Sequence, residues 1–268
     1  MAARSRMREL GSELRATPFV SMLPNETFIE IIRLASADSD GWCDNTMVLA
    51  RSMGVCRYWR DLIINTPLLW TRIELSNNTQ YIRQFLARSG SASITLSCPY
   101  LRRTRLSVLA PLLEPHYARV ARTDFRFFDD EDAATLPAML SSFLPCLASI
   151  SLRLYSFITL RQRYCMRLES RHLPSLRSLS LERFTLDLTP DFPLSRLVTL
   201  RLSLVDLPGD HQCLVTFLDM LEACKSLENF SWGKSGFKNY CELCEHGARA
   251  DRIIPLHQCS PLAGYTPL

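Results

Sequence analysis

Residues 176–181 read Leu-Arg-Ser-Leu-Ser-Leu, and residues 197–202 repeat the pattern as Leu-Val-Thr-Leu-Arg-Leu. Looser copies begin at Leu147 and Leu227, so the first positions of the four copies lie 29, 21 and 30 residues apart. A still looser copy lies around Phe125 and Phe127. Apolar residues at alternate positions predict short strands with one buried face. The spacing is close to the period of about 20 to 29 residues that is typical of leucine-rich repeats.

Apolar residues at helical spacing lie between these strands. They occur at Leu136, Leu140, Phe143 and Leu144, and again at Leu214, Phe217, Leu218 and Leu221. A strand-helix unit that cannot bury its own apolar face must stack on its neighbours. We therefore expect a curved αβ solenoid with its strands on the concave side, which is a binding surface.

The non-leucine positions of the predicted strands should point away from the core. These positions are Ser151, Arg153, Ser180, Glu182, Arg201, Ser203 and Ser231. Four of them are our candidates for substrate binding: Arg153, Glu182, Arg201 and Ser203. The alternative interpretation is that all seven are ordinary solvated surface residues.

The alternation of strands and helices begins near Trp70. Residues 71–75 and 93–97 have the pattern of strands, and residues 79–88 that of a helix, with Asn78 as N-cap and Gly90 at the C-terminal end. Alternating strands and helices favour αβ units over separate sheets and bundles.

The region before Trp70 predicts three short helices. Residues 23–34 have helical apolar spacing with Asn25 placed as an N-cap, residues 47–53 can form a second helix, and residues 55–64 carry an apolar stripe that includes Val55 and Trp59. So small a module is marginally stable by itself. It needs a partner or a neighbouring domain.

This module resembles the F-box. It opens with Leu-Pro-Asn-Glu at residues 23–26, continues with paired aliphatic residues, and closes with Val-Cys-Arg-Tyr-Trp-Arg-Asp-Leu at residues 55–62. Both halves of the F-box pattern are present in order. Residues 66–73 are also similar to the segment that follows the F-box in many fungal-type members.

The resemblance implies binding to the Skp-type adaptor of a cullin-RING ubiquitin ligase. The adaptor-binding candidates are Leu23, Pro24, Ile29, Ile32, Val55, Cys56 and Trp59. Apolar anchors of this kind dock into a groove on a partner. The alternative is that they form the interior of a three-helix bundle, which is an equally good interpretation for Ile32 and Leu62. Leu23, Pro24 and Cys56 are the stronger interface candidates on the family pattern.

Composition places the chain among folded proteins that work inside the cell, in the cytoplasm or the nucleus. Of 268 residues, 47% are apolar and 22% charged, and no stretch is long and apolar enough to span a membrane. The N-terminus is rich in Arg but lacks the apolar core of a secretory signal, which leaves a solvated tail or an organelle-targeting segment. The net charge of +4 comes from scattered Arg, so we expect no binding of nucleic acid.

The sequence contains ten cysteines, most of which we interpret as reduced apolar residues. A zinc site made of Cys241, Cys244, His257 and Cys259 is an alternative for the C-terminal part of the chain, although the second pair has unusual spacing. The sequence has no nucleophile, phosphate-binding or metalloprotease motif. We therefore expect no cofactor and no enzymatic activity.

These patterns predict an α+β chain with four parts: a tail at residues 1–20, an F-box at 21–70, an irregular leucine-rich-repeat-like αβ solenoid at 71–240, and an irregular or truncated segment at 241–268. The expected function is a non-catalytic substrate receptor of an SCF-type ubiquitin ligase, with the adaptor, a cullin and a protein substrate as partners. The alternatives are an interaction scaffold without a ligase and a zinc-dependent binding module.

Overall fold

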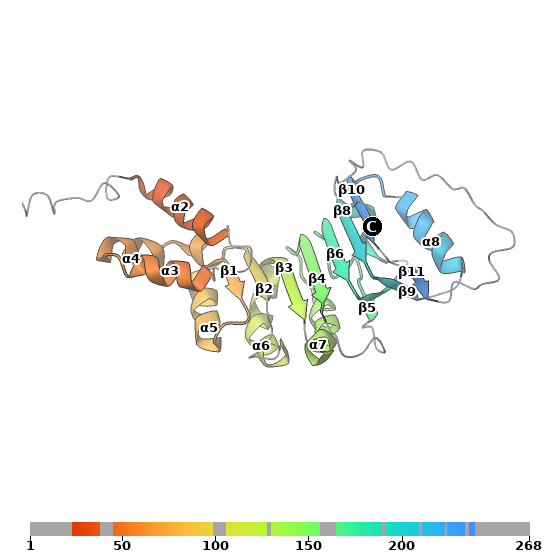
Figure 1. Cartoon of the computed structure of the whole chain (residues 1–268), viewed down its shortest axis with the longest axis horizontal. Coiled ribbons are helices and arrows are strands. Elements are labelled where there is room, and N and C mark those ends of the chain that lie inside the picture. Colours follow the sequence, from red (N-terminus) through yellow and green to blue (C-terminus); the bar gives the residue numbers. More distant parts are fainter. Residues whose placement is uncertain are drawn as a thin grey trace, which may run out of the picture. The chain divides into compact units, whose positions relative to one another are not determined.

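The chain divides between Leu69 and Trp70 into two units. The structure is a computed structural model that describes residues 23–37, 45–98, 106–127, 130–155, 165–188, 191–208, 211–222, 224–233 and 236–238 (Figure 1). The first unit is helical, and the second is built on a parallel sheet. The fold class is therefore mixed α/β. Among the described helices, none combines the length and the apolar character that crossing a bilayer requires.

In the described part of the first unit there are three α-helices, and they are followed by a short 3-10 helix. The elements are α2 (Asn25–Ala37), α3 (Asn45–Met53), α4 (Arg57–Ile64) and η2 (Pro67–Trp70). Helix α2 starts differently from the sequence-based expectation. The amide of Phe28 donates to the carbonyl of Pro24 over 3.1 Å, so Pro24 takes the N-cap position expected for Asn25. Val55 was expected on the third helix, but it precedes α4 and is 62% exposed.

A seven-stranded sheet forms the centre of the second unit. Its strands are all parallel, and they follow one another in space in the order of the chain (Figure 1). They are β1 (Arg72–Glu74), β2 (Ile94–Cys98), β3 (Val120–Phe127), β4 (Ser149–Leu154), β6 (Ser178–Glu182), β8 (Thr199–Ser203) and β10 (Asn229–Gly233). The five strands from β3 to β10 coincide with the five copies of the alternating apolar pattern in the sequence.

A second, four-stranded parallel sheet accompanies the later strands. It contains β5 (Cys165–Arg167), β7 (Thr185–Asp187), β9 (Asp206–Pro208) and β11 (Gly236–Lys238), in the order β11-β9-β7-β5. The sequence did not predict this sheet, because strands of three residues are too short to show an alternating pattern.

The turn that leads from the seven-stranded sheet to the four-stranded sheet has the same conformation after β6 and after β8. Arg183 follows β6 with a φ of 64°, and Leu204 follows β8 with a φ of 52°. Their amides extend the ladder to the next strand: Arg183 donates to the carbonyl of Ser203 over 3.0 Å, and Leu204 donates to that of Gly233 over 2.8 Å. The two left-handed residues are 21 residues apart, as are the leucines of their strands.

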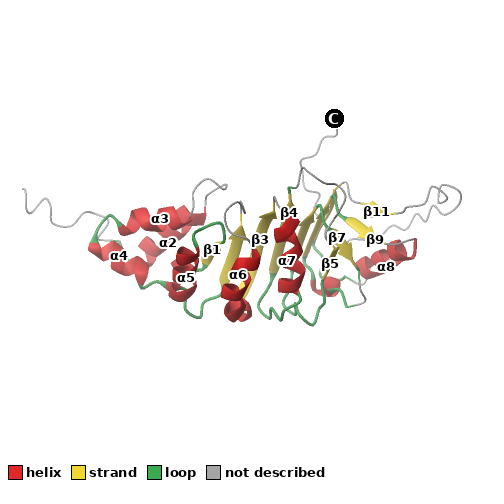
Figure 2. Cartoon of the chain, turned by 90° about the horizontal axis from the view of Figure 1, so that it is seen from below, coloured by secondary structure: helices red, strands yellow, loops and turns green. Residues whose placement is uncertain are grey.

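Helices cover one face of the seven-stranded sheet. Figures 1 and 2 show α5 (Thr79–Arg88), α6 (Leu106–Leu113) and α7 (Asp130–Leu140) side by side along this face, and α8 (His211–Glu222) lies near the other end of the unit. Helix α5 matches the predicted range, and the side chain of Asn78 accepts from the amide of Gln80 over 2.9 Å, which confirms its role as N-cap. Phe143 was expected on a helix, but α7 ends at Leu140 and Phe143 is 61% exposed.

The core lies between this sheet and the helices. In β4, β6 and β8, every second residue is buried, and the residues between are partly or fully exposed. Phe125, Phe127 and Phe184 are among the largest fully buried side chains, and the ring of Phe127 lies 5.8 Å from that of Phe125 and 6.5 Å from that of Phe184. One face of the sheet is therefore apolar and covered, and the opposite face is polar and open.

The start of β3 sets which residues face the core. The pairing of β2 with β3 shifts between Ile94 and Thr95, which leaves Ala121 as an extra residue in β3. After this bulge, Thr123 points into the core beside apolar neighbours and is 1% exposed. Its hydroxyl oxygen has no hydrogen-bond partner.

Arg119 joins the first strand-helix unit to the next one. This residue ends the 3-10 helix η3 (Glu114–Arg119), and its guanidinium donates to the carbonyls of Leu86 and Ala92 over 2.9 and 3.1 Å and to the hydroxyl of Ser89 over 2.8 Å. It thereby neutralises the partial negative charge at the C-terminus of α5. Burial, and secondarily the charge of Arg119, lowers the pKa of the neighbouring His116.

We predict that Arg119→Ala lowers the free energy of unfolding by about 2 kcal/mol, because it removes the hydrogen bonds that the guanidinium donates to Ser89, Leu86 and Ala92. Urea denaturation of the full chain measures this loss. Arg122→Ala is the matched control, since Arg122 is exposed on the adjacent strand and has no described side-chain partner; we expect a change within about 0.5 kcal/mol. Equal losses in the two variants would contradict the role assigned to Arg119.

We predict that Thr123→Val raises the free energy of unfolding by about 1 kcal/mol, because it removes an unsatisfied buried hydroxyl while it keeps the side-chain volume. Thr123→Ser keeps the hydroxyl and deletes a buried methyl group, so it should lower the same quantity by about 1 kcal/mol. Parallel denaturation curves of the two variants measure both effects. A destabilising Thr123→Val would show that the hydroxyl is satisfied in solution.

Candidate functional site

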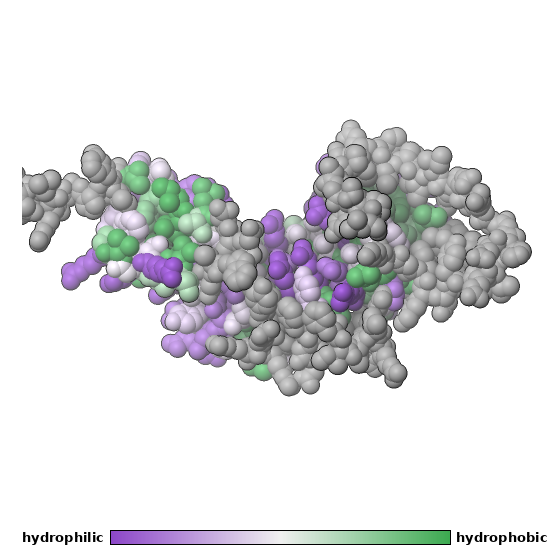
Figure 3. All heavy atoms as spheres, in the orientation of Figure 1, coloured by the Kyte–Doolittle hydropathy of each residue, from purple (hydrophilic) through white to green (hydrophobic). Residues whose placement is uncertain are grey.

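The first unit exposes more large apolar side chains than its size would suggest. Figure 3 shows hydrophobic residues gathered over the helices of this unit. The exposed side chains are Ile31, Leu34, Met47, Val55, Tyr58 and Leu68, each between 44% and 63% exposed. An exposed apolar surface of this kind on a small domain indicates an interaction site.

The structure distributes the seven predicted adaptor-binding residues over three environments. Pro24, Val55 and Cys56 are exposed, and Leu23, Ile29 and Trp59 are half-buried. Ile32 is only 5% exposed and belongs to the interior together with Phe28 and Leu49. Ile32 can therefore support the surface but offers little area to a partner.

Cys56 has a structural role at the start of α4. It adopts an extended conformation with φ −157°, and its Sγ accepts from the amide of Trp59 over 3.5 Å, as an N-cap does. The extended conformation explains why the helix cannot begin earlier and why Val55 lies outside it. Arg60 donates from Nε to the carbonyl of Met53 over 3.1 Å, which fixes α4 to the end of α3.

Two contacts join the halves of the sequence motif. The rings of Phe28 and Trp59 lie 4.5 Å apart at 58°, and the hydroxyl of Tyr58 donates to Oδ1 of Asn25. Residues more than 30 positions apart in the chain are thereby held together. The contacts fix the start of α2 against α4, and both halves of the motif contribute to one surface.

Five exposed residues of this surface were not predicted from the sequence: Ile31, Leu34, Met47, Tyr58 and Leu68. A signal was present in α2, where apolar residues occupy more of the helix circumference than one stripe needs. Phe28 and Ile32 fill the interior, so Ile31 and Leu34 remain outside at 48% and 53% exposure.

The open face of the sheet holds the four predicted substrate-binding residues. Strand pairing places Arg153 opposite Glu182, and Glu182 opposite Ser203, so these three form one row across β4, β6 and β8. Arg201 lies in the neighbouring row between Ser180 and Ser231. All four are partly or fully exposed.

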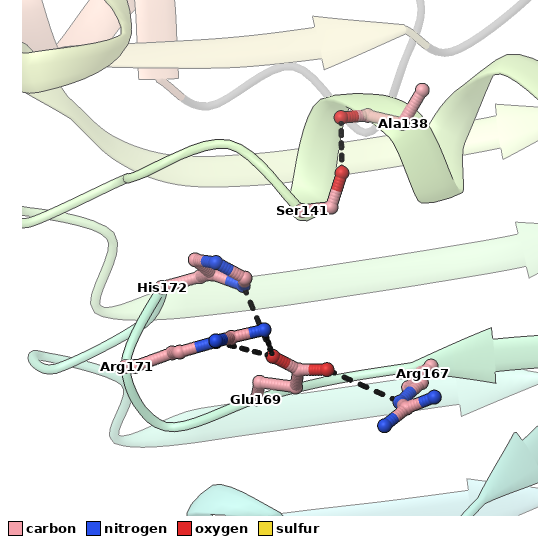
Figure 4. A network of polar contacts seen from close by, with 6 residues as sticks. All are labelled: Ala138, Ser141, Arg167, Glu169, Arg171 and His172. Carbon is pink, nitrogen blue, oxygen red and sulfur yellow. Dashed lines mark hydrogen bonds and ion pairs between the residues drawn. The ribbon is translucent and has the colours of Figure 1, made fainter.

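A charged cluster around Glu169 lies in the turn before β6, and no sequence pattern predicted it. Figure 4 shows the Glu169 carboxylate between two arginines and a histidine, at 3.1 Å from Arg167, 2.6 Å from Arg171 and 3.7 Å from Nδ1 of His172. The Glu169 side chain is only 12% exposed. The carbonyl of His172 accepts from the amide of Leu144 over 2.9 Å. The cluster therefore holds this turn in place, and its central carboxylate is fully compensated.

The residues of the alternative zinc site, Cys241, Cys244, His257 and Cys259, lie outside the described residues. Within the described ranges, no group of His, Cys, Asp or Glu has an arrangement that could hold a metal ion.

Comparison with known domain families identifies an F-box-like domain at residues 20–76. This range includes both halves of the sequence motif and the helices α2, α3 and α4. No curated protein and no solved structure matched the chain. F-box domains generally bind Skp-type adaptors, and this family assignment suggests an SCF-type substrate receptor in general terms.

We predict that Trp59→Ala and Val55→Ser separate folding from exposure within this domain. Trp59→Ala removes the ring that packs on Phe28 and should destabilise the three helices by about 2 kcal/mol. Val55→Ser changes an exposed side chain and should leave stability within about 0.5 kcal/mol of the wild type. Hydrogen-deuterium exchange of α3 and α4, read by mass spectrometry in the full chain, measures both. Faster exchange in Val55→Ser than in Trp59→Ala would contradict the structure.

Proposed function

We propose that this chain is a non-catalytic substrate-receptor subunit of a cullin-RING ubiquitin ligase of the SCF type. The observation that carries the proposal is the exposed apolar surface on the F-box-like domain. The first unit would bind a Skp-type adaptor, and the adaptor would connect the chain to a cullin. Ubiquitin transfer would be performed by other subunits, in the cytoplasm or the nucleus.

Adaptor binding would bury the apolar side chains that the first unit leaves exposed. Full burial of a large apolar side chain contributes about 1.5 kcal/mol or more, and these side chains are about half exposed, so each would contribute roughly half of that. A few residues dominate most interfaces, so a set of this size is sufficient to anchor a partner. Pro24 and Val55 combine exposure with a place in the family pattern, so we assign them to the interface. Ile31, Leu34 and Met47 extend the same apolar character along α2 and α3.

We further propose that the second unit is a leucine-rich-repeat-like solenoid that binds a protein substrate. Three features support this architecture: strands that follow one another in chain order, alternating buried leucines at 21-residue and 29- to 30-residue spacing, and the recurring left-handed turn after β6 and β8. The open face of the sheet, with Arg153, Glu182, Arg201 and Ser203, would be the substrate-binding surface.

We predict that co-expressed Skp-type adaptor co-purifies with the wild-type chain and that the double variant Met47→Asp with Val55→Asp reduces the recovered adaptor about tenfold or more. Charged groups introduced into an apolar interface lose their hydration without gaining a partner. Quantitative pull-down with an affinity tag on the chain gives the readout.

The matched control is Tyr81→Asp, which places the same charge on a side chain that is 49% exposed on α5, in the second unit. This variant should recover the adaptor like the wild type. Circular dichroism verifies that each variant is folded. Absence of adaptor from the wild-type pull-down would sink the proposal, and adaptor without cullin in the complex would favour an interaction scaffold.

A further inference from the structure

The charges on the open face of the sheet are not evenly spread. From β3 to β8 this face carries four arginines and two carboxylates, and Figure 3 shows hydrophilic residues gathered over the middle of the sheet. Three of the arginines, Arg122, Arg126 and Arg153, lie on the adjacent strands β3 and β4. The remaining arginine, Arg201, lies on β8, and β6 beside it carries Glu182. The positive charge is therefore concentrated on β3 and β4.

Arg126 and Arg153 stand directly opposite one another in the β3–β4 pairing. Neighbouring strands lie about 4.8 Å apart, and like charges placed opposite each other destabilise a sheet. Neither guanidinium, nor that of Arg122, has an ion-pair or side-chain hydrogen-bond partner among the described residues. An anion placed between Arg126 and Arg153 would turn this repulsion into attraction.

Asp124 lies between Arg122 and Arg126 on the same strand and the same face. The residue is half-buried, and its Oδ1 atom is buried without a hydrogen-bond partner. Its neighbours across the sheet are Ser97 and Ser151, and neither satisfies this oxygen. The other oxygen, Oδ2, is not one of the buried unsatisfied atoms, so a donor from outside the sheet can reach the carboxylate there.

Together these side chains form a positive-negative-positive series along β3. Arg122 and Arg126 are four residues apart, which is about 13 Å along an extended strand. An extended peptide directs its residues i, i+2 and i+4 to one side over the same distance, because successive side chains alternate. A peptide that lies along β3 can therefore present one side chain to each member of the series.

We propose that the β3–β4 face binds an extended acidic segment of a protein with the pattern acidic, any, donor, any, acidic. This inference rests on the proposed receptor function, since it names the class of substrate. Asp or Glu at the two ends pairs with Arg122 and with the Arg126–Arg153 pair, respectively. Ser, Thr or Lys at the centre donates to Asp124. The central carboxylate of Asp124 rejects an acidic residue or a phosphate at that position.

Biotinylated peptides immobilised on streptavidin beads test the pattern with the full chain, because dense presentation makes modest affinities measurable. The core Glu-Ala-Ser-Ala-Glu should capture the wild type about tenfold better than Lys-Ala-Ser-Ala-Lys or Glu-Ala-Glu-Ala-Glu, as expected for charge-assisted contacts. Added salt should weaken the capture.

Variants of the face assign the contacts. Arg126→Glu should reduce capture of Glu-Ala-Ser-Ala-Glu about tenfold, and Arg126→Gln should reduce it less. Arg83→Glu is the control, because it makes the same charge change on an exposed arginine of α5, away from the open face. Asp124→Asn should remove the discrimination against Glu-Ala-Glu-Ala-Glu.

Three results would overturn the inference: equal capture of acidic and basic peptides, unchanged capture by folded Arg126→Glu and Arg126→Gln, or stronger capture of a peptide with phosphoserine at the centre. Adaptor pull-down with the same preparations separates the two proposals. Wild-type chain that recovers adaptor but shows no peptide preference refutes only the acidic-segment inference. Peptide preference without adaptor recovery refutes only the receptor function.

Discussion

The structure depends on one constraint, the burial of every second residue along the strands of a parallel sheet. Leu179, Leu200 and Ile150 occupy one inward row and are fully buried, and a slip of one residue would bring their outward neighbours into the core. The inward positions are therefore fixed by packing. The outward positions need not be apolar. The strand register decides which of their side chains lie next to one another. Ala121, the extra residue in β3, shows how strictly the alternation of inward and outward side chains is kept, because the bulge directs the arginines of β3 to the open face.

In the F-box-like domain the main constraint is its small size. Three helices of 13, 9 and 8 residues have room for few interior side chains, and Phe28, Ile32, Leu49 and Ile63 fill these places. Other apolar residues, among them Ile31, Leu34 and Val55, remain exposed, although each exposed apolar group reduces solubility. The contact of Phe28 with Trp59 and the cap formed by Cys56 hold the helices in a fixed arrangement. A domain with this arrangement presents a surface that is formed before a partner arrives, so less conformational entropy is lost on binding.

The sequence predicted the features that depend on local periodicity and failed on those that depend on distant pairing. The leucine pattern at residues 176–181 and 197–202 predicted the strands β6 and β8, and Asn78 predicted where α5 begins. Helix α6 was missed, since its residues are almost all apolar and contain Pro111, so they show no polar face. The four-stranded sheet was missed because its strands have three residues each. Strand pairing is not local, so the sequence could name Arg153, Glu182 and Ser203 as outward residues but could not place them in one row. The same limit hid the position of Arg126 opposite Arg153.

Two carboxylates in the second unit show how the chain treats buried charge. Glu169, at 12% side-chain exposure, has two arginines and a histidine within 4 Å, as a structural role requires. Asp124 is also partly buried, and it lies between two arginines on its own strand, yet one of its oxygens has no donor and neither arginine turns toward it to form an ion pair. A side chain kept only for stability would be satisfied or replaced by an apolar residue. Glu169 is therefore held by the fold, whereas the Asp124 carboxylate is not paired with either neighbouring arginine, which leaves its Oδ2 and both guanidinium groups available to an external ligand on the open face of β3 and β4.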